Sequence, residues 1–522
     1  MTPTVTELLL ARADDGRCGL RFEDSSWTWA EVVRRCAERA SLLRSLRRPG
    51  PFHVGVLLGN VPEFTFLLGG AAFSGAVLVG LNPTRRGAAL ARDVRVTDCQ
   101  LVLTDAAHAD LLADLDLDVP VLEVDSPAWS DLLAEHAGAE LAPVAAGPDD
   151  LLVLVFTSGT GGDPKAVRCT HAKIAFPGRM LAERFGLTGE DVTYVAMPLF
   201  HSNALMAGWA VGLAAGATIA LRRRFSASGF LPDVRRFGAT YANYVGKPLA
   251  HVLATPPRPD DADNPLRVVY GNEANERDLR RFAERFGCLV VDGFGSTEGG
   301  IAISRTPDTP PGALGRLPEG VAVLDPETGK PCATAEFSPD GTLLNPDEAI
   351  GELVNTAGAG WFAGYYNAPE ADAERMRDGM YWSGDLAYLD ADGFCHFAGR
   401  TADWLRVDGE NLATAPIERV LQRHPEVREA AVYGVPDPVV GDQVMAALVT
   451  TGAFTVEEFA GFLSAQADLG PKQWPRYLRL ASDLPRTATH KVLKRQLQSE
   501  ALGTEDPVYR RSDRGTYVRH RA

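Results

Sequence analysis

The segment from Phe156 to Val167 carries the groups most suited to binding phosphate. It reads Phe-Thr-Ser-Gly-Thr-Gly-Gly-Asp-Pro-Lys-Ala-Val and follows an apolar run, Leu151 to Val155, that predicts a buried strand. Its glycines allow consecutive N–H groups to point into one concavity, while its hydroxyls and ammonium add donors and positive charge. It is not a Walker A loop, because Pro164 and Lys165 stand where that motif has Gly-Lys. Taken alone, the segment could equally be a polar surface turn.

Four later segments carry further chemical groups. After the apolar strand predicted at 289–291, the loop that follows contains Glu298, whose carboxylate could hold Mg²⁺ on bound phosphates. A single acidic loop residue can also be merely solvated. Asp385 follows Tyr-Trp-Ser-Gly and could accept hydrogen bonds from both hydroxyls of a ribose. The remaining two segments are Gly399-Arg400 with Gly409-Glu410-Asn411, and a loop that ends at Lys491.

Length and composition limit the class of protein. A chain of 522 residues is too long for one core and suggests two to four domains. A net charge of −16 argues against nucleic acid as a partner. Seven scattered cysteines, never in a C-x-x-C, indicate reduced thiols in a cytoplasm and give no zinc-binding spacing. The start of the chain does not resemble a signal peptide.

The apolar residues predict the elements that must position these groups. Thr28 and Glu31 predict a capping box at the start of a helix over 29–46. Strands and helices then alternate as far as residue 294, which indicates an α/β fold with parallel sheets. Two apolar runs, 64–81 and 204–221, contain several glycines, and each is interpreted as a buried helix followed by a strand, with no integral membrane segment.

The chain is predicted to comprise two domains and a tail. Residues 1–399 form a large N-terminal core of packed parallel sheets with helices, whose part from about 307 to 399 is β-rich. Residues 400–502 form a small mobile α+β domain. Residues 503–522 form a basic tail, interpreted as disordered and solvated.

Taken together and in this order, the five segments resemble those of the adenylate-forming (ANL) superfamily. This superfamily includes acyl-CoA ligases, peptide-synthetase adenylation domains and beetle luciferases. The segment from Thr157 to Lys165 resembles its phosphate loop, and Phe-Gly-Ser-Thr-Glu at 294–298 resembles its Tyr-Gly-x-Thr-Glu motif. Gly-Glu-Leu at 351–353 with Gly-Tyr-Tyr-Asn-Ala-Pro-Glu at 364–370 resembles the segment before its ribose-binding aspartate. The resemblance covers about residues 5 to 500.

Details within the resemblance favour acyl-CoA ligases over amino-acid adenylation domains. Met-Pro-Leu-Phe-His-Ser-Asn at 197–203 resembles the acyl-pocket motif of fatty-acid ligases, with His201 gating the carboxylate. Tyr-Val-Gly-Lys at 244–247 and Asp-Gly-Glu-Asn at 408–411 are similar to bacterial long- and very-long-chain fatty-acyl-CoA synthetases and fatty-acid transport proteins. The implied acyl-pocket residues are Asn203, Tyr244, Val245 and Gly246.

The resemblance also implies roles for the other residues. ATP, Mg²⁺ and coenzyme A are the implied cofactors, and a carboxylic acid or an acyl-adenylate is the implied substrate, with a homodimer as a possible assembly. Lys491 is the implied catalytic lysine, Glu298 the metal-binding and catalytic carboxylate, Ala402 the hinge, and Gly409 with Glu410 the CoA-binding residues. The implied ATP- and AMP-binding residues are Thr157, Ser158, Gly159, Thr160, Gly161, Lys165, Gly271, Asn272, Glu273, Asp292, Gly293, Phe294, Gly295, Thr297, Asp385 and Arg400.

Three residues depart from the family pattern. Gly161 stands where the loop usually has a third hydroxyl, Ala166 replaces a glycine, and Ala402 replaces the usual Asp or Lys of the hinge. A working AMP-forming ligase for a hydrophobic acid, either a fatty acid or a polycyclic compound, is the main interpretation. The alternatives are a variant specialised in converting a preformed acyl-adenylate to the thioester, an acyl-AMP ligase that loads a carrier protein, and a non-catalytic nucleotide-binding module.

Overall fold

The computed structural model of the chain separates into two compact units. The first comprises Met1–Gly299 and Trp361–Ala373, and the second comprises Gly300–Gly360 and Glu374–Ala522. The domain boundaries predicted at residues 399 and 502 stay predictions. The structure describes residues 2–157, 164–246, 248–274, 276–339, 343–400, 404–407, 410–437, 441–466, 469, 473–486, 492–512 and 515–520.

One sheet of the first unit contains, at one edge, the two strands that flank the predicted phosphate segment. Its strands run in the order β6-β5-β3-β4-β7-β8, parallel except for β8, which is antiparallel to β7. The strand predicted at Leu151 to Val155 is confirmed within β7. The strands are β3 (His53–Leu57), β4 (Val77–Gly80), β5 (Cys99–Thr104), β6 (Val121–Glu123), β7 (Leu151–Thr157) and β8 (Lys165–Thr170).

A second sheet of the first unit carries further groups predicted to bind nucleotide and acid. Within this unit its order is β13-β12-β11-β9-β10-β1-β2, and only the β1–β2 pair is antiparallel. Parallel strands place their carboxyl ends at one edge, where ligands bind in open α/β sheets. The strands are β1 (Cys18–Phe22), β2 (Ser25–Thr28), β9 (Val192–Val195), β10 (Thr218–Leu221), β11 (Tyr241–Val245), β12 (Val268–Asn272) and β13 (Leu289–Gly295).

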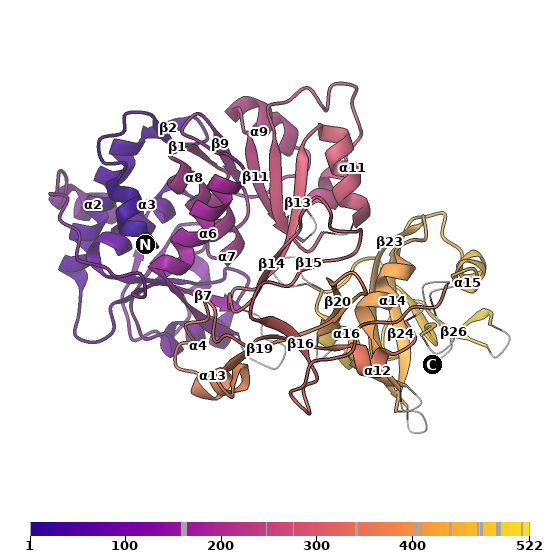
Figure 1. Ribbon diagram of the computed structural model, residues 1–522. Helices are drawn as coiled ribbons and strands as arrows, with labels where there is room; N and C mark the ends of the chain where they lie inside the picture. Colours follow the sequence, from indigo (N-terminus) through magenta and orange to yellow (C-terminus); the bar gives the residue numbers. More distant parts are fainter. Residues whose placement is uncertain are drawn as a thin grey trace. The chain divides into compact units, whose positions relative to one another are not determined.

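Helices connect these strands, and Figure 1 follows the alternation in sequence colour from indigo to pink. The helix predicted at 29–46 is confirmed. Thr28 Oγ1 accepts from the Glu31 backbone N–H at 3.2 Å, and the Glu31 carboxylate accepts from the Thr28 N–H at 2.8 Å. The helices are α1 (Val5–Leu10), α2 (Trp29–Leu46), α3 (Pro62–Ser74), α4 (Gly87–Val96), η1 (Ala109–Leu111), α5 (Pro127–Glu135), α6 (His171–Arg184), α7 (Ser202–Ala204), the π-helical turn η2 (Leu205–Trp209), α8 (Ala210–Ala215), α9 (Phe230–Phe237), α10 (Pro248–Leu253) and α11 (Glu276–Phe286).

The two long apolar runs lie in the core, as predicted. The first forms α3 and β4, and the second forms α7, η2, α8 and β10; most of their residues are buried. Across the described part of the chain, no helix combines the length and apolar character needed to cross a membrane.

The second unit contains the β-rich region that the sequence predicts. A sheet runs in the order β15-β20-β19-β17-β16, with β18 on β19, and all its pairs are antiparallel. The region comprises β14 (Ala302–Ser304), β15 (Gly315–Arg316), β16 (Val321–Leu324), α12 (Pro346–Ala349), β17 (Gly351–Asn355), β18 (Met376–Arg377), β19 (Met380–Leu389) and β20 (Phe394–Arg400). Helix α13 (Pro369–Arg375) spans the boundary between the two units.

A second sheet of this unit forms the predicted α+β part. Its order is β22-β21-β24-β25-β26-β27, and β23 pairs with β24. The expectation of an α/β fold with a β-rich subdomain and an α+β part is therefore confirmed. The elements are β21 (Trp404–Val407), β22 (Glu410–Ala413), α14 (Thr414–Leu421), β23 (Val427–Asp437), β24 (Gly441–Thr450), α15 (Val456–Ser464), β25 (Tyr477–Leu480), α16 (Lys494–Glu500), β26 (Val508–Arg511) and β27 (Tyr517–Arg519).

The expectation of a disordered basic tail is wrong. Strand β26 pairs with β25, and β27 pairs with β26, so the segment extends the sheet. Tyr517 is buried, and its hydroxyl donates to the Pro475 carbonyl at 2.6 Å. The arginines obscured this pattern because Arg510 and Arg519 lie on the exposed positions of strands whose other side chains include buried Val508 and Tyr517.

Removal of the Tyr517 side chain tests whether the tail is part of the core of this sheet. Tyr517→Ala is expected to lower the local free energy of opening by about 3 kcal/mol, since it deletes a buried aromatic ring. Backbone amides of β25–β27 should then exchange about one hundredfold faster in hydrogen-exchange mass spectrometry. Val518→Ala is the matched control, because Val518 is 55% exposed. Equal exchange in both variants would contradict the assignment.

Candidate active site

Glu298 lies in the loop after β13 and is held by two hydroxyl groups. Its Oε1 accepts a hydrogen bond from Tyr365 Oη at 3.0 Å and a longer one from Thr157 Oγ1 at 3.4 Å. Thr157 is the last residue of β7, in the other sheet of the same unit. The fold therefore joins the phosphate segment to the predicted metal-binding carboxylate, although the two residues are 141 positions apart.

The backbone of Glu298 is fixed by a buried lysine. Lys173, in the first turn of α6, donates from Nζ to the Glu298 carbonyl at 2.8 Å and to the Arg168 carbonyl at 3.3 Å. Burial lowers the pKa of Lys173. The sequence prediction assigned no role to Lys173 or Tyr365. A charged residue among the apolar residues that follow His171 was the available signal for Lys173.

Lys165 begins β8 directly opposite Thr157, so the two ends of the predicted phosphate segment are neighbours. Lys165 Nζ lies 5.5 Å from the centroid of the Tyr365 ring. Cationic, hydroxyl and carboxylate groups thus gather around one tyrosine. Of the remaining predicted phosphate-binding residues, Ser158, Gly159, Thr160 and Gly161 lie outside the described residues.

Hydrogen bonds also join the carboxyl ends of β11, β12 and β13. Tyr244 Oη donates to Asp292 Oδ1 at 2.5 Å, and Asn272 Nδ2 donates to the Gly293 carbonyl at 2.5 Å. Asn203 Nδ2 donates to the Tyr244 carbonyl at 2.9 Å and to Asn272 Oδ1 at 3.3 Å. Predicted acyl-pocket and adenine-binding residues therefore form one network.

The remaining predicted residues of this edge occupy the same strand ends and loops. Gly271 packs against Tyr244, and a Cβ at Gly271 would lie 2.2 Å from the Tyr244 carbonyl oxygen, which excludes any side chain there. Glu273 has a positive φ of 68°, an uncommon conformation for a residue other than glycine. Thr297 shares a hydrogen bond of 2.7 Å with Ser202 through their hydroxyls. Val245 ends β11, Gly246 donates its N–H to the Asn272 carbonyl, and Phe294 and Gly295 end β13.

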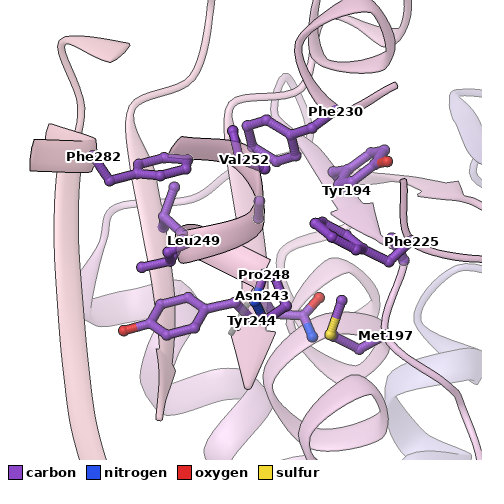
Figure 2. A pocket seen from close by; sticks show the side chains of 13 residues that line it. Tyr194, Met197, Phe225, Phe230, Asn243, Tyr244, Pro248, Leu249, Val252 and Phe282 are labelled. Atoms are coloured by element: carbon purple, nitrogen blue, oxygen red, sulfur yellow. The ribbon is translucent and has the colours of Figure 1, made fainter. Parts of the chain in front are cut away.

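An apolar pocket lies beside this network. Figure 2 shows its lining, which is built mainly from aromatic and aliphatic side chains of the second sheet and of α9, α10 and α11. Its free space is about 10 Å³, room for about one water molecule. Of the four predicted acyl-pocket residues, Tyr244 lines it, while Asn203 holds the neighbouring Asn243 through a hydrogen bond of 2.7 Å.

His201 precedes α7 with a buried side-chain nitrogen. Among the described residues, its Nε2 has no hydrogen-bond partner. Burial lowers the pKa of His201 to about 4, so the imidazole is neutral at pH 7. A neutral imidazole needs no counterion when it is buried, and the role predicted for His201, gating the carboxylate, stays a prediction.

In the second unit, the predicted ribose-binding residues lie opposite one another on paired strands. Asp385 of β19 and Arg400 of β20 face each other in register, with 3.1 Å between Asp385 Oδ1 and Arg400 Nε. The Asp385 N–H donates to Ser383 Oγ at 3.1 Å. Ala402, Gly409 and Lys491 lie outside the described residues, and for Glu410 only the place in β22 is described.

Comparisons with known proteins agree with this arrangement. The family model described as "AMP-binding enzyme" matches residues 11–366, and the model described as "AMP-binding enzyme C-terminal domain" matches residues 416–491. The chain is 58% identical over 510 residues to a medium/long-chain-fatty-acid–CoA ligase, FadD17, of Mycobacterium marinum, covering 97% of this chain and 98% of the relative. It is 51% identical over 525 residues to a steroid-22-oyl-CoA synthetase of Rhodococcus jostii, covering 99% and 94%.

A solved structure shows the same fold. ATP-bound MatB from Rhodopseudomonas palustris superposes with a TM-score of 0.82 at 25% identity, covering 95% of this chain and 99% of that chain. Fold and site together define an AMP-forming acid–thiol ligase. The chain belongs to the AMP-binding enzyme family, so the predicted membership of the adenylate-forming superfamily is confirmed.

Proposed function

We propose that the chain joins a hydrophobic carboxylic acid to coenzyme A in two steps, using ATP. The observation that supports this most strongly is the network between Tyr244 and Asp292. It fastens the wall of an apolar pocket to β13, and the loop after β13 carries Glu298. An acid in the pocket and a nucleotide at the strand ends would therefore share one edge of the sheet.

In the first step, a carboxylate oxygen attacks the α-phosphorus of ATP. A new O–P bond forms, the bond between the α-phosphorus and the bridging oxygen breaks, and pyrophosphate leaves. Two anions must approach one another, so donors and cations on the phosphates supply most of the catalysis. Thr157, Ser158, Thr160 and Lys165 would hold the β- and γ-phosphates, with backbone N–H groups of Gly159 and Gly161. Lys491 would lie between the carboxylate and the α-phosphate.

The residues proposed to bind the nucleoside are Asp385, Arg400, Gly271, Asn272 and Asp292. Asp385 would accept from the ribose hydroxyls, and its pairing with Arg400 orients the carboxylate. The strand ends at Gly271, Asn272 and Asp292 would frame the adenine. Their mutual hydrogen bonds support this role, because a fixed backbone edge is needed to accept a planar ring.

Glu298 is suited to bind a Mg²⁺ ion that is held by the phosphates of ATP. Mg²⁺ usually takes one or two carboxylates together with phosphate oxygens and water. No group of three or more His, Cys, Asp or Glu side chains suited to a metal occurs in the described ranges, which agrees with an ion held largely by phosphate. When bound, Mg²⁺ would neutralise phosphate charge. Tyr365 and Lys173 would keep the carboxylate in place to receive it.

In the second step, the thiol sulfur of coenzyme A attacks the acyl carbonyl carbon and a C–S bond forms. The bond between that carbon and the phosphate oxygen breaks, AMP leaves, and the thiol proton is released to solvent. Gly409 and Glu410 would border the path of the thiol, and the C-terminal domain would alternate between two orientations about Ala402.

A cytoplasmic location is also proposed, supported by seven cysteines that form no disulfide. A homodimer stays a prediction.

The substrate is proposed to be a bulky hydrophobic acid. The names of the two relatives specify a medium- or long-chain fatty acid for one and a steroid-22-oyl group for the other. The aromatic and aliphatic lining of the pocket is apolar, as either acyl group requires, but its side chains would have to move apart to admit one, because the present space holds about one water molecule.

Parallel assays of both half-reactions test this proposal. A panel of fatty and polycyclic acids is incubated with ATP, Mg²⁺ and coenzyme A, and pyrophosphate, acyl-AMP and acyl-CoA are measured. Acid-dependent pyrophosphate release and acyl-CoA formation are expected, both lost in Lys491→Ala. Conversion of synthetic acyl-AMP without pyrophosphate release would instead support the thioesterification variant raised by Gly161, Ala166 and Ala402. Transfer to a holo-carrier protein but not to CoA would support a carrier-loading ligase.

Paired tyrosine variants test the role of Glu298. Tyr365→Phe removes the donor to the Glu298 carboxylate and is expected to lower kcat/KM for ATP about tenfold, since a hydrogen bond to a charged group contributes about 1.5 kcal/mol or more. Tyr366→Phe is the matched control, because the neighbouring hydroxyl donates to Asp98 instead. Equal steady-state constants for both variants would contradict the role.

A further inference from the structure

The wall of the apolar pocket contains one hydrogen-bond acceptor without a partner among the described residues. Three of the lining side chains carry polar atoms: Tyr194, Tyr244 and Asn243. The Tyr194 hydroxyl donates to Asp233 Oδ2 at 3.1 Å, and the Tyr244 hydroxyl donates to Asp292. Asn243 is only 5% exposed, and its Oδ1 is buried and unpaired.

The orientation of the Asn243 amide follows from its neighbours. Asn272 must direct Nδ2 to the Gly293 carbonyl, because a carbonyl can only accept, and this leaves Asn272 Oδ1 facing Asn203. Asn203 must direct Nδ2 to the Tyr244 carbonyl for the same reason. Asn203 Oδ1 therefore accepts from Asn243 Nδ2 at 2.7 Å. The free atom of Asn243 is consequently an oxygen, not an N–H.

Asn243 is one of the residues that line the pocket, so its amide borders the space proposed for the acyl group. Figure 2 shows the Asn243 amide among Met197, Phe225 and Tyr244, with its oxygen and nitrogen directed to opposite sides. Gly208 of the π-helical turn is its neighbour, and a Cβ at that position would lie 2.7 Å from Asn243 Oδ1. Gly208 therefore packs closely against this oxygen, and any side chain at that position would clash with it.

A buried acceptor without a donor is unfavourable, and a ligand that supplies the donor recovers the lost interaction. An ammonium donor would need a carboxylate nearby, and the two carboxylates that reach this lining, Asp233 and Asp292, each already accept from a tyrosine. A hydroxyl is the neutral donor that fits an otherwise apolar wall.

We propose that the acyl group carries a hydroxyl that donates to Asn243 Oδ1, so that the preferred substrates are hydroxylated hydrophobic acids. The inference rests on the proposed function and narrows its substrate class. Asn243 then acts as a specificity-determining residue, placed by Asn203 and Asn272. A single water bound to Asn243 is the competing explanation for the unpaired oxygen.

Matched acids that differ by one hydroxyl separate these explanations. Fatty and polycyclic acids are each compared with derivatives hydroxylated at successive positions along the same skeleton. Binding is measured by isothermal titration calorimetry and turnover by acyl-CoA formation. At least one hydroxylated isomer is expected to exceed its parent acid about tenfold or more in both affinity and kcat/KM. In Asn243→Leu, and in the smaller Asn243→Ala, this preference should disappear.

A control variant and the contrary outcomes complete the test. Val252→Ala enlarges the apolar pocket without changing the hydrogen-bond network. It should therefore change the affinity and kcat/KM for parent and hydroxylated acids to the same extent. The comparison of parent and hydroxylated acids with the wild-type enzyme tests the inference even if the Asn243 variants fold poorly. The inference is overturned if no hydroxylated isomer is preferred by the wild type, or if the preference survives in the Asn243 variants. Hydroxyl-dependent binding without any turnover would support Asn243 as the acceptor while contradicting the proposed ligase activity.

Discussion

The hydrogen bond from the Tyr244 hydroxyl to Asp292 is the interaction on which the site depends most. It crosses from β11 to the end of β13, and Asn203 and Asn272 secure the same strand ends through backbone carbonyls. The backbone hydrogen bonds between parallel strands do not fix the side chains at the strand ends, so side-chain hydrogen bonds are needed to hold these ends together. The network makes the three strand ends one surface, with an apolar pocket behind it. Loss of this bond would loosen pocket and strand ends together.

A second constraint comes from burial of charge. Lys173 is buried, yet it can remain a donor because two carbonyls face it, and one of them belongs to Glu298. The loop after β13 is therefore fixed by its backbone, while Tyr365 and Thr157 orient its carboxylate. Backbone and side chain of Glu298 are therefore held by the end of β7, by helix α6 and by a later segment that contains Tyr365. Such preorganisation reduces the rearrangement needed when charged phosphates bind.

The sequence predicted local features well and long-range partners poorly. Helix α2 followed from Thr28 and Glu31, since a capping box needs only residues three apart. The sequence assigned Thr157 and Glu298 to binding ATP and its Mg²⁺, but it did not predict the contact between them. Nothing local indicated that Lys173, Tyr365 and Asn243 reach the same edge, because their partners lie in other strands. At the C-terminus the prediction failed because it counted the arginines and gave no weight to the apolar and aromatic residues between them, of which Val508 and Tyr517 are buried in strands.

The central claim is that a carboxylate oxygen of the acid attacks the α-phosphorus of ATP. Isotope transfer tests this step directly, because the attacking oxygen remains on AMP when the thiol displaces it. A hydrophobic acid labelled with ¹⁸O in both carboxylate oxygens is incubated with ATP and coenzyme A. The masses of the AMP and pyrophosphate formed are then measured by mass spectrometry. One ¹⁸O per molecule of AMP, with none in pyrophosphate, is the predicted result. Unlabelled AMP, or label in inorganic phosphate, would contradict the account.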